Sequence, residues 1–147
     1  MSNRAAEWFA EMEQRERVKN EERLQNARET APKRPTVVAV DFDGTLCDNA
    51  WPSIGREHWG TIRWCLSARA AGAKLILWTN RTERLLREAV RWCKAHGLEF
   101  DAVNENLPGI IDAFGGDTRK VVADIYLDDK AVSAQTVEMM MRGITPQ

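Results

Sequence analysis

Short apolar runs alternate with amphipathic segments over most of the chain. Four of these runs have the length and composition of buried strands, and they cover residues 36–42, 73–78, 98–103 and 121–127. Apolar residues recur every three or four positions in two segments, which predicts helices with one buried face over 57–71 and 82–95. A last helix is expected over about 131–142, before Gly143. The stretch 104–120 is irregular, and we expect one helical turn at 110–114.

The order of these elements predicts an α/β fold. Strands that alternate with helices are joined by right-handed crossovers, which produces a parallel sheet with helices on both faces. We therefore expect a Rossmann-like three-layer sandwich with a small, mainly parallel sheet over residues 36–147. In such sheets the ligand lies at the carboxyl ends of the strands.

Residues 1–35 have a different composition. They contain eight Lys or Arg, seven Asp or Glu and almost no β-branched residues, which favours a charged helix. Pro32 and Pro35 then form a linker. Trp8, Phe9 and Met12 form a short apolar stripe. Two interpretations stay open: a solvated helix, or an arm that docks on a partner, on a second subunit or back on the domain.

The overall composition narrows the class of protein. A chain of 147 residues with 44% apolar residues fits one domain with an appendage. The net charge of −1 gives little support to a general binder of nucleic acid or membrane surfaces. No apolar run is long enough to span a bilayer or to form a signal peptide. The three widely spaced cysteines fit neither a disulfide framework nor a zinc site, so we expect a cytoplasmic protein.

Polar residues follow three of the four predicted strands. Asp41 and Asp43 end the first strand, Thr79 the second, and Asp128 and Asp129 the fourth. Taken alone, the first pair is typical of a strand that ends in a solvated Asp-Gly turn. Because the carboxyl ends of parallel strands meet at one edge, however, we expect all these side chains to converge.

Four carboxylates at one edge repel one another unless a cation neutralises them. Hard oxygen ligands suit Mg²⁺, which readily takes a substrate phosphate as a further ligand. Lys120 lies just before the fourth strand, where it balances phosphate charge only if the loop before it curls over to the carboxyl ends of the strands. This combination indicates phosphoryl chemistry, in which a carboxylate also serves as a covalent nucleophile.

Four segments resemble the motifs of the haloacid dehalogenase (HAD) superfamily of phosphatases, in the family's order. They are Asp41-Phe42-Asp43-Gly44-Thr45-Leu46, Thr79 after an apolar strand, Lys120, and Leu127-Asp128-Asp129. The resemblance covers residues 36–142. It implies that Asp41 attacks phosphorus, forms an aspartyl-phosphate and binds Mg²⁺. It also implies that Asp43 protonates the leaving group, activates water and binds the metal through its backbone carbonyl.

The resemblance implies further roles. Thr79 and the Asn80 backbone N–H bind the phosphoryl oxygens, and Lys120 stabilises the charge of nucleophile and phosphoryl group. Arg119 adjoins Lys120, so either residue is a candidate for the cation of the third motif. Asp128 is the expected acidic metal ligand, with Asp129 as the alternative. Arg81 either reaches a second substrate anion or caps the start of the following helix.

The resemblance is to small members of the family that have no cap domain. The loops at 44–56 and 104–120 are too short to form one, so the site is open unless a large substrate or another subunit covers it. We expect a Mg²⁺-dependent phosphomonoester hydrolase of unknown substrate. The alternatives are a non-catalytic binding or adaptor protein on the same scaffold and a polynucleotide-end phosphatase.

Three loop positions each have two interpretations. Trp51 either stacks on a substrate or packs over the edge of the strand. The Asn104-Glu105-Asn106 segment either contacts substrate or forms a turn. Cys47 is either a reactive thiol or an inert core residue, and nothing in the sequence lowers its pKa.

Overall fold

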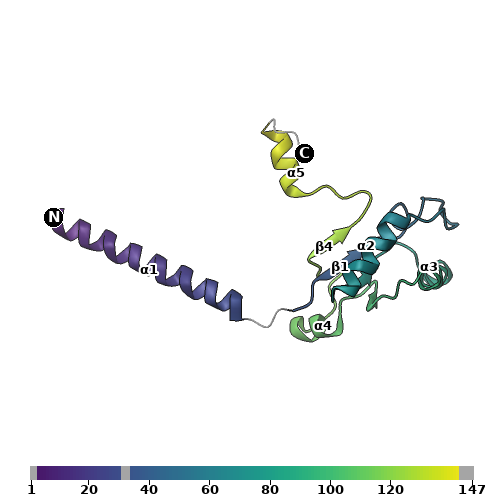
Figure 1. Ribbon diagram of the computed structural model, residues 1–147, viewed down its shortest axis with the longest axis horizontal. Helices are drawn as coiled ribbons and strands as arrows, with labels where there is room; N and C mark the ends of the chain where they lie inside the picture. Colours follow the sequence, from purple (N-terminus) through teal and green to yellow (C-terminus); the bar gives the residue numbers. More distant parts are fainter. Residues whose placement is uncertain (1–2, 31–33, 143–147) are drawn as a thin grey trace. The chain divides into compact units, whose positions relative to one another are not determined.

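The computed structural model describes residues 3–30 and 34–142, and it divides into two compact units, Met1–Arg34 and Pro35–Gln147. The first unit is the helix α1 (Asn3–Thr30), which confirms the predicted N-terminal helix (Figure 1). Its described large apolar side chains are all exposed, namely Trp8, Phe9, Met12, Val18 and Leu24. Docking of this arm stays a prediction. Among the described residues, no helix combines the length and apolar character needed to cross a bilayer.

The second unit is built on a four-stranded parallel sheet, in the order β3-β2-β1-β4. Its strands are β1 (Val37–Val40), β2 (Lys74–Leu77), β3 (Ala102–Val103) and β4 (Ile125–Leu127). All four residues of β1 are buried because this strand is central and covered on both faces, which explains its unbroken apolar run. The predicted α/β fold with a parallel sheet is confirmed.

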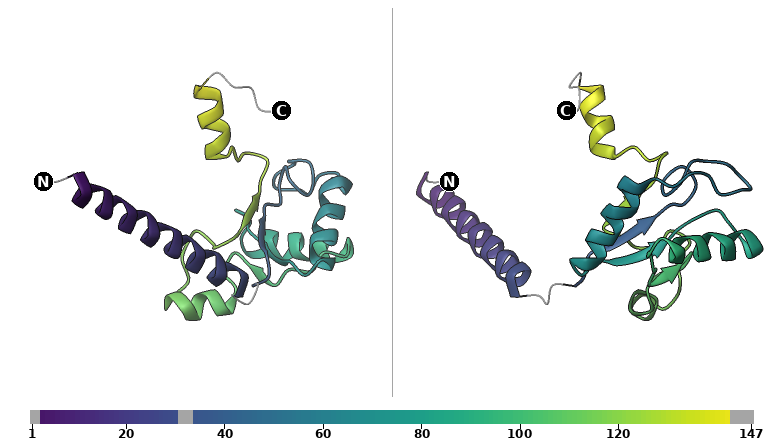
Figure 2. Two further views of the ribbon diagram at one scale, coloured as in Figure 1. Left: turned by 60° about the vertical axis from the view of Figure 1, so that its left-hand side comes forward. Right: turned by 45° about the vertical axis from the view of Figure 1, so that its right-hand side comes forward.

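Two helices cover one face of the sheet. They are α2 (Trp59–Ala70) and α3 (Glu83–Ala95), which Figure 2 shows beside the sheet. Both helices contribute to one core with alternate residues of the central strands, a core that includes Val38, Val40, Leu75, Leu77, Ile62, Cys65, Ala89 and Cys93. These helices make the β1–β2 and β2–β3 crossovers, as the sequence predicts.

The opposite face is covered mainly by loop residues, which differs from the prediction of helices on both faces. Its core joins Val37, Ala39 and Ile76 to side chains from the segment between β3 and β4, namely Leu107, Val121 and Ala123. That segment also contains the short helix α4 (Pro108–Phe114). The last helix, α5 (Ala134–Met141), leaves Val137, Met140 and Met141 exposed. Pro32 and Gly143, a predicted linker residue and helix stop, lie outside the described residues.

The third and fourth strands are shorter than the predicted runs of 98–103 and 121–127. The Tyr126 hydroxyl donates to the Val121 carbonyl over 2.7 Å, so the chain before β4 folds back instead of extending. Leu98 is buried in the first core with no strand partner, so β3 begins only at Ala102. Residues at the start of both predicted strands are engaged by a side-chain hydrogen bond or by core packing in place of strand pairing. An apolar run in the sequence reveals neither kind of contact.

The three cysteines are core residues. Cys47, Cys65 and Cys93 are all buried free thiols. Burial raises the pKa of Cys47, and it raises the pKa of Cys65 to about 11 and that of Cys93 to about 12. A thiol with a raised pKa carries little thiolate at neutral pH, so Cys47 is the inert alternative.

Candidate active site

The register of the sheet brings the motif residues together. Val40 at the end of β1 pairs with Leu77 of β2 and with Leu127 of β4. The Asp41 backbone N–H continues this pattern by donating to the Leu127 carbonyl over 2.9 Å. The residues that follow each of these strands therefore share one edge of the sheet, the carboxyl edge, as expected for parallel strands.

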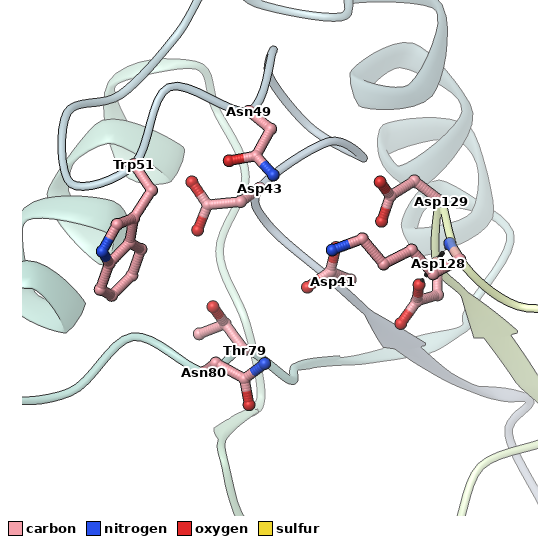
Figure 3. Close-up of a pocket in the computed structure, with 9 residues that line it drawn as sticks. Asp41, Asp43, Asn49, Trp51, Thr79, Asn80, Asp128 and Asp129 are labelled. Carbon is pink, nitrogen blue, oxygen red and sulfur yellow. Dashed lines mark hydrogen bonds between the residues drawn. The ribbon is translucent and has the colours of Figure 1, made fainter.

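An open cleft of about 400 Å³ lies at this carboxyl edge. Its lining residues are Asp41, Asp43, Asn49, Trp51, Thr79, Asn80, Asp128, Asp129 and Lys130 (Figure 3). A second hollow of similar size shares several of these residues and adds Trp78 and Arg119. The cleft thus gathers six of the eight predicted site residues. Arg81 and Lys120 are the two that do not line it.

Three carboxylates gather around the end of β1. Asp41, Asp128 and Asp129 each offer an oxygen atom, and these atoms lie within 4.8 Å of one another. Burial raises the pKa of the Asp41 carboxyl, and the charges of Asp128 and Asp129 raise it further. The hydrogen bonds that Asp41 accepts lower this pKa, but they do not outweigh the other effects. Such a set of hard oxygen donors fits Mg²⁺, because a divalent cation relieves the repulsion within the cluster.

Thr45 and Gly44 hold this acidic cluster in shape. The Thr45 hydroxyl donates to Asp41 Oδ2 over 2.9 Å and accepts the Asp129 backbone N–H over 3.0 Å. Gly44 has a φ of +87°, and a Cβ at this position would collide with the Asp129 carboxylate. The Gly-Thr pair after the two aspartates therefore couples β1 to the loop after β4, a role that the sequence analysis did not assign.

The Asp43 carboxylate is not part of the acidic cluster. Both of its oxygens accept hydrogen bonds from Arg81, from Nε over 2.8 Å and from Nη2 over 2.6 Å. Figure 3 shows this carboxylate on the Trp51 side of the cleft, away from Asp128 and Asp129. The three predicted side-chain ligands come together, and metal binding by Asp43, which was predicted through its backbone carbonyl, stays a prediction.

Arg81 occupies a different place from either of its predicted roles. It is fully buried, so its guanidinium neither caps a helix in solvent nor lies open in the cleft. Besides binding Asp43, it donates to the carbonyls of Pro52 and Ser53 over 3.0 and 2.7 Å. Arg81 therefore connects the acid of the first motif to the loop that follows it.

The loop after β2 is shaped by Asn104. The Asn104 side-chain oxygen accepts the Thr79 backbone N–H over 2.8 Å, and Asn104 itself has a φ of +53°. Asn106 is buried, and its amide group binds Asp117 and the Val122 N–H, which ties down the segment before β4. Of the two interpretations of this asparagine pair, the structural one holds, because both side chains are engaged by the protein.

Two cations, Arg119 and Lys130, line hollows at the acidic cluster, whereas Lys120 lines neither of them. Lys120 is exposed, with Nζ at 5.3 Å from the centroid of the Tyr126 ring. Arg119 lines the second hollow together with Asp41, and Lys130 lines the main cleft. Lys130 was not among the predicted site residues, although it directly follows Asp128 and Asp129 and so lies at the same edge. Both candidates for the third motif stay open.

The fold and the cleft define an α/β protein with an acidic site at the carboxyl edge of a parallel sheet. The chain matches no family model and no curated protein sequence. It does match a solved structure, that of a conserved protein coded by a locus of Bacteroides thetaiotaomicron, with 34% identity and a TM-score of 0.60. The match covers 76% of this chain and 94% of that protein, and the chain therefore belongs to the same family as the conserved Bacteroides protein.

Proposed function

We propose that this protein is a Mg²⁺-dependent phosphomonoester hydrolase of the haloacid dehalogenase type, which acts through an aspartyl-phosphate intermediate. The observation that carries the proposal is the cluster of Asp41, Asp128 and Asp129, whose carboxylate oxygens lie within 4.8 Å of one another, next to Thr79 in one cleft. A Mg²⁺ ion held by these three acids supplies charge neutralisation for the cluster and for the substrate phosphate.

Asp41 is the nucleophile in this proposal. One of its carboxylate oxygens attacks phosphorus, and the ester bond to the leaving group breaks. Because Thr45 donates to Asp41 Oδ2, the hydroxyl fixes the carboxylate in one orientation before the attack. Thr79 and Asn80 line the same cleft, which supports a role for them in binding the phosphoryl oxygens.

Asp43 acts first as the general acid and then as the general base. The leaving oxygen takes a proton from Asp43 as the ester bond breaks, so Asp43 must be protonated at that moment. A water molecule then attacks the aspartyl-phosphate and gives its proton to Asp43, which releases phosphate and restores the Asp41 carboxylate. The Arg81 guanidinium contacts both oxygens of Asp43 and holds the carboxyl group in one orientation for these transfers.

Replacing the nucleophile tests the proposal. Asp41→Asn keeps the shape of the side chain but removes its nucleophilic charge, so hydrolysis of p-nitrophenyl phosphate with Mg²⁺ is expected to fall by at least about 10³-fold. The matched control is Asp112→Asn on α4, an exposed aspartate outside the cleft, which should keep full activity. EDTA should abolish turnover in both the wild type and this control.

Two outcomes would contradict the proposal. Undiminished turnover by a folded Asp41→Asn protein would exclude Asp41 as nucleophile. Absence of turnover by the wild type, over a broad panel of phosphomonoesters with Mg²⁺, would instead favour a binding protein on this scaffold. Thermal melting of each variant separates loss of chemistry from loss of fold.

A further inference from the structure

A column of stacked groups runs from the core to the cleft. The Cζ atom of Arg81 lies 5.0 Å from the ring centroid of Phe42 and 5.2 Å from that of Trp51. Phe42 and Arg81 are fully buried, whereas Trp51 is 54% exposed. The column therefore begins in the first core and ends on an aromatic ring that lines the cleft.

The loop that carries Trp51 is braced from several sides. Buried Arg81 binds the carbonyls of the two residues directly after Trp51, Pro52 and Ser53. The loop ends are joined by the Asp48 N–H, which donates to the Arg56 carbonyl over 2.8 Å. The indole is thus exposed but not loose, and a ligand that stacks on it loses little affinity to ordering of the loop.

Trp51 differs in this respect from the other exposed tryptophans of the domain. Trp59 and Trp64 lie on α2 and are absent from the lining of the cleft. Trp51 shares the cleft with the amide side chains of Asn49 and Asn80. Amides supply both hydrogen-bond donors and acceptors, which suit the mixed polar edge of a nucleobase or the hydroxyls of a sugar.

The position of Trp51 relative to the acidic cluster bears on the chemistry of the leaving group. Figure 3 shows Trp51 across the cleft from Asp128 and Asp129, so a leaving group that points away from a phosphate at the acidic cluster comes to lie beside the indole. The Asp43 carboxylate lies on that side as well. Because the charge of Asp43 is balanced by Arg81, the main attraction on this side is stacking of a planar ring on the indole.

We propose that Trp51 is a stacking platform for the base of a nucleoside phosphate, which makes nucleoside phosphates the substrate class of this site. The inference rests on the proposed phosphatase function. A free mononucleotide and the phosphorylated end of an oligonucleotide offer the same chemistry to this platform. Both fit a cleft without a cap, because the rest of either molecule extends into solvent.

The first experiment compares kcat/KM for adenosine monophosphate and for glycerol phosphate, which has no ring. The wild type is expected to prefer the nucleotide by about 10-fold or more, since base stacking on an aromatic side chain has an effect of this order. Trp51→Leu should lower that preference about 10-fold, and Trp51→Phe should retain most of it. The matched control, Trp64→Leu, should leave the preference unchanged, because Trp64 lies outside the cleft.

The two sources are then compared as substrates. A higher kcat/KM for adenosine monophosphate than for a short oligonucleotide with a terminal phosphate identifies free nucleotides, and the reverse identifies chain ends. Either result supports the stacking platform, provided that Trp51→Leu removes the advantage. Equal kcat/KM for nucleotide and glycerol phosphate, or a preference that Trp51→Leu leaves intact, overturns it.

Failure of the proposed function gives a different result. If the wild type hydrolyses glycerol phosphate without preferring the nucleotide, the phosphatase stands and the stacking inference falls. If it hydrolyses no phosphomonoester, the phosphatase falls, and titration calorimetry with adenosine monophosphate and Mg²⁺ still tests the platform. Binding that Trp51→Leu weakens about 10-fold then supports the inference, and absence of binding by the wild type overturns it.

Discussion

The two edges of the sheet use the same residue type in opposite ways. At the amino edge, Asp124 accepts the Val37 N–H at its Oδ2 over 2.8 Å and donates its own N–H to the Val37 carbonyl. Asp101 binds Leu75 of the neighbouring strand in the same pattern, with a side-chain bond of 2.9 Å. Each of these acids completes the hydrogen bonding of a strand where the strand begins.

The electrostatic surroundings of the two edges also differ. Burial alone raises the pKa of Asp101, but the Leu75 N–H, Lys74 and Arg69 outweigh it and hold this pKa below its usual value. At the carboxyl edge, burial and two neighbouring carboxylates raise the pKa of Asp41 instead. Acids surrounded by donors and cations serve the fold. Acids gathered with one another repel, and the cation that we propose at this site would relieve that repulsion.

The largest effect is expected from removing charge at the carboxyl edge. Asp128→Asn and Asp129→Asn each remove one proposed ligand, so the proposed Mg²⁺-dependent phosphatase activity should fall by at least about 100-fold in each. Without Mg²⁺, both variants should melt above the wild type, because repulsion around Asp41 is reduced. Enzyme assays measure the loss of activity, and calorimetric melting in EDTA measures the rise in melting temperature. An acid whose replacement lowers the melting temperature in EDTA would belong with the structural acids of the amino edge.

Asp43 sharpens the comparison because it lies at the carboxyl edge but is paired like an acid of the amino edge. Arg81→Met would leave Asp43 without its buried partner, and we expect the free energy of unfolding to fall by about 3 kcal/mol. Arg81→Lys keeps the charge but loses the paired geometry, and it should recover part of this stability. Urea denaturation measures both variants. A loss below about 1 kcal/mol for Arg81→Met would show that the pair does little for stability.

The sequence predicts the edge at which the acids gather but not how each of them is held. The unbroken apolar run of β1 and the break at Gly44 are local features, and the strand order then places Asp41 beside Asp128. The Asp43–Arg81 pair joins residues 38 positions apart, and no spacing rule connects them. Arg81 follows a predicted strand end, where exposure is the usual expectation, so its burial depends on tertiary packing that periodicity does not encode.

The division between acids of the fold and acids of the site also shows where local patterns stop being informative. Asp124 interrupts the predicted fourth strand, and as a lone acid within an apolar run it gives no sign of its bond to Val37. Lys130 follows the acids of the fourth strand directly, so the convergence that identified Asp128 and Asp129 places it at the edge as well. The bond between Asp124 and Val37 is a long-range contact that the sequence does not reveal. The position of Lys130, in contrast, could be predicted by the reasoning that identified Asp128 and Asp129.

The smallest effect is expected at the amino edge, and it depends on pH. Asp101→Asn imitates the protonated acid, which keeps a hydrogen-bond acceptor but loses the charge that faces Lys74 and Arg69. Because the pKa of Asp101 is lowered in the folded protein, its stabilising effect is fully present above the unfolded pKa of about 3.9 and is lost as the pH falls through the lowered value.

The variant should therefore be less stable than the wild type by about 1 kcal/mol at neutral pH, a modest value because both cations are partly exposed. The difference should shrink toward zero as the pH falls below about 4. Urea denaturation over this range measures it, with Asp112→Asn as the control that shows no difference at any pH. A deficit that stayed constant into acid would mean that Asp101 acts through its shape and not through its charge. The contrast between the two edges would then rest on the carboxyl edge alone.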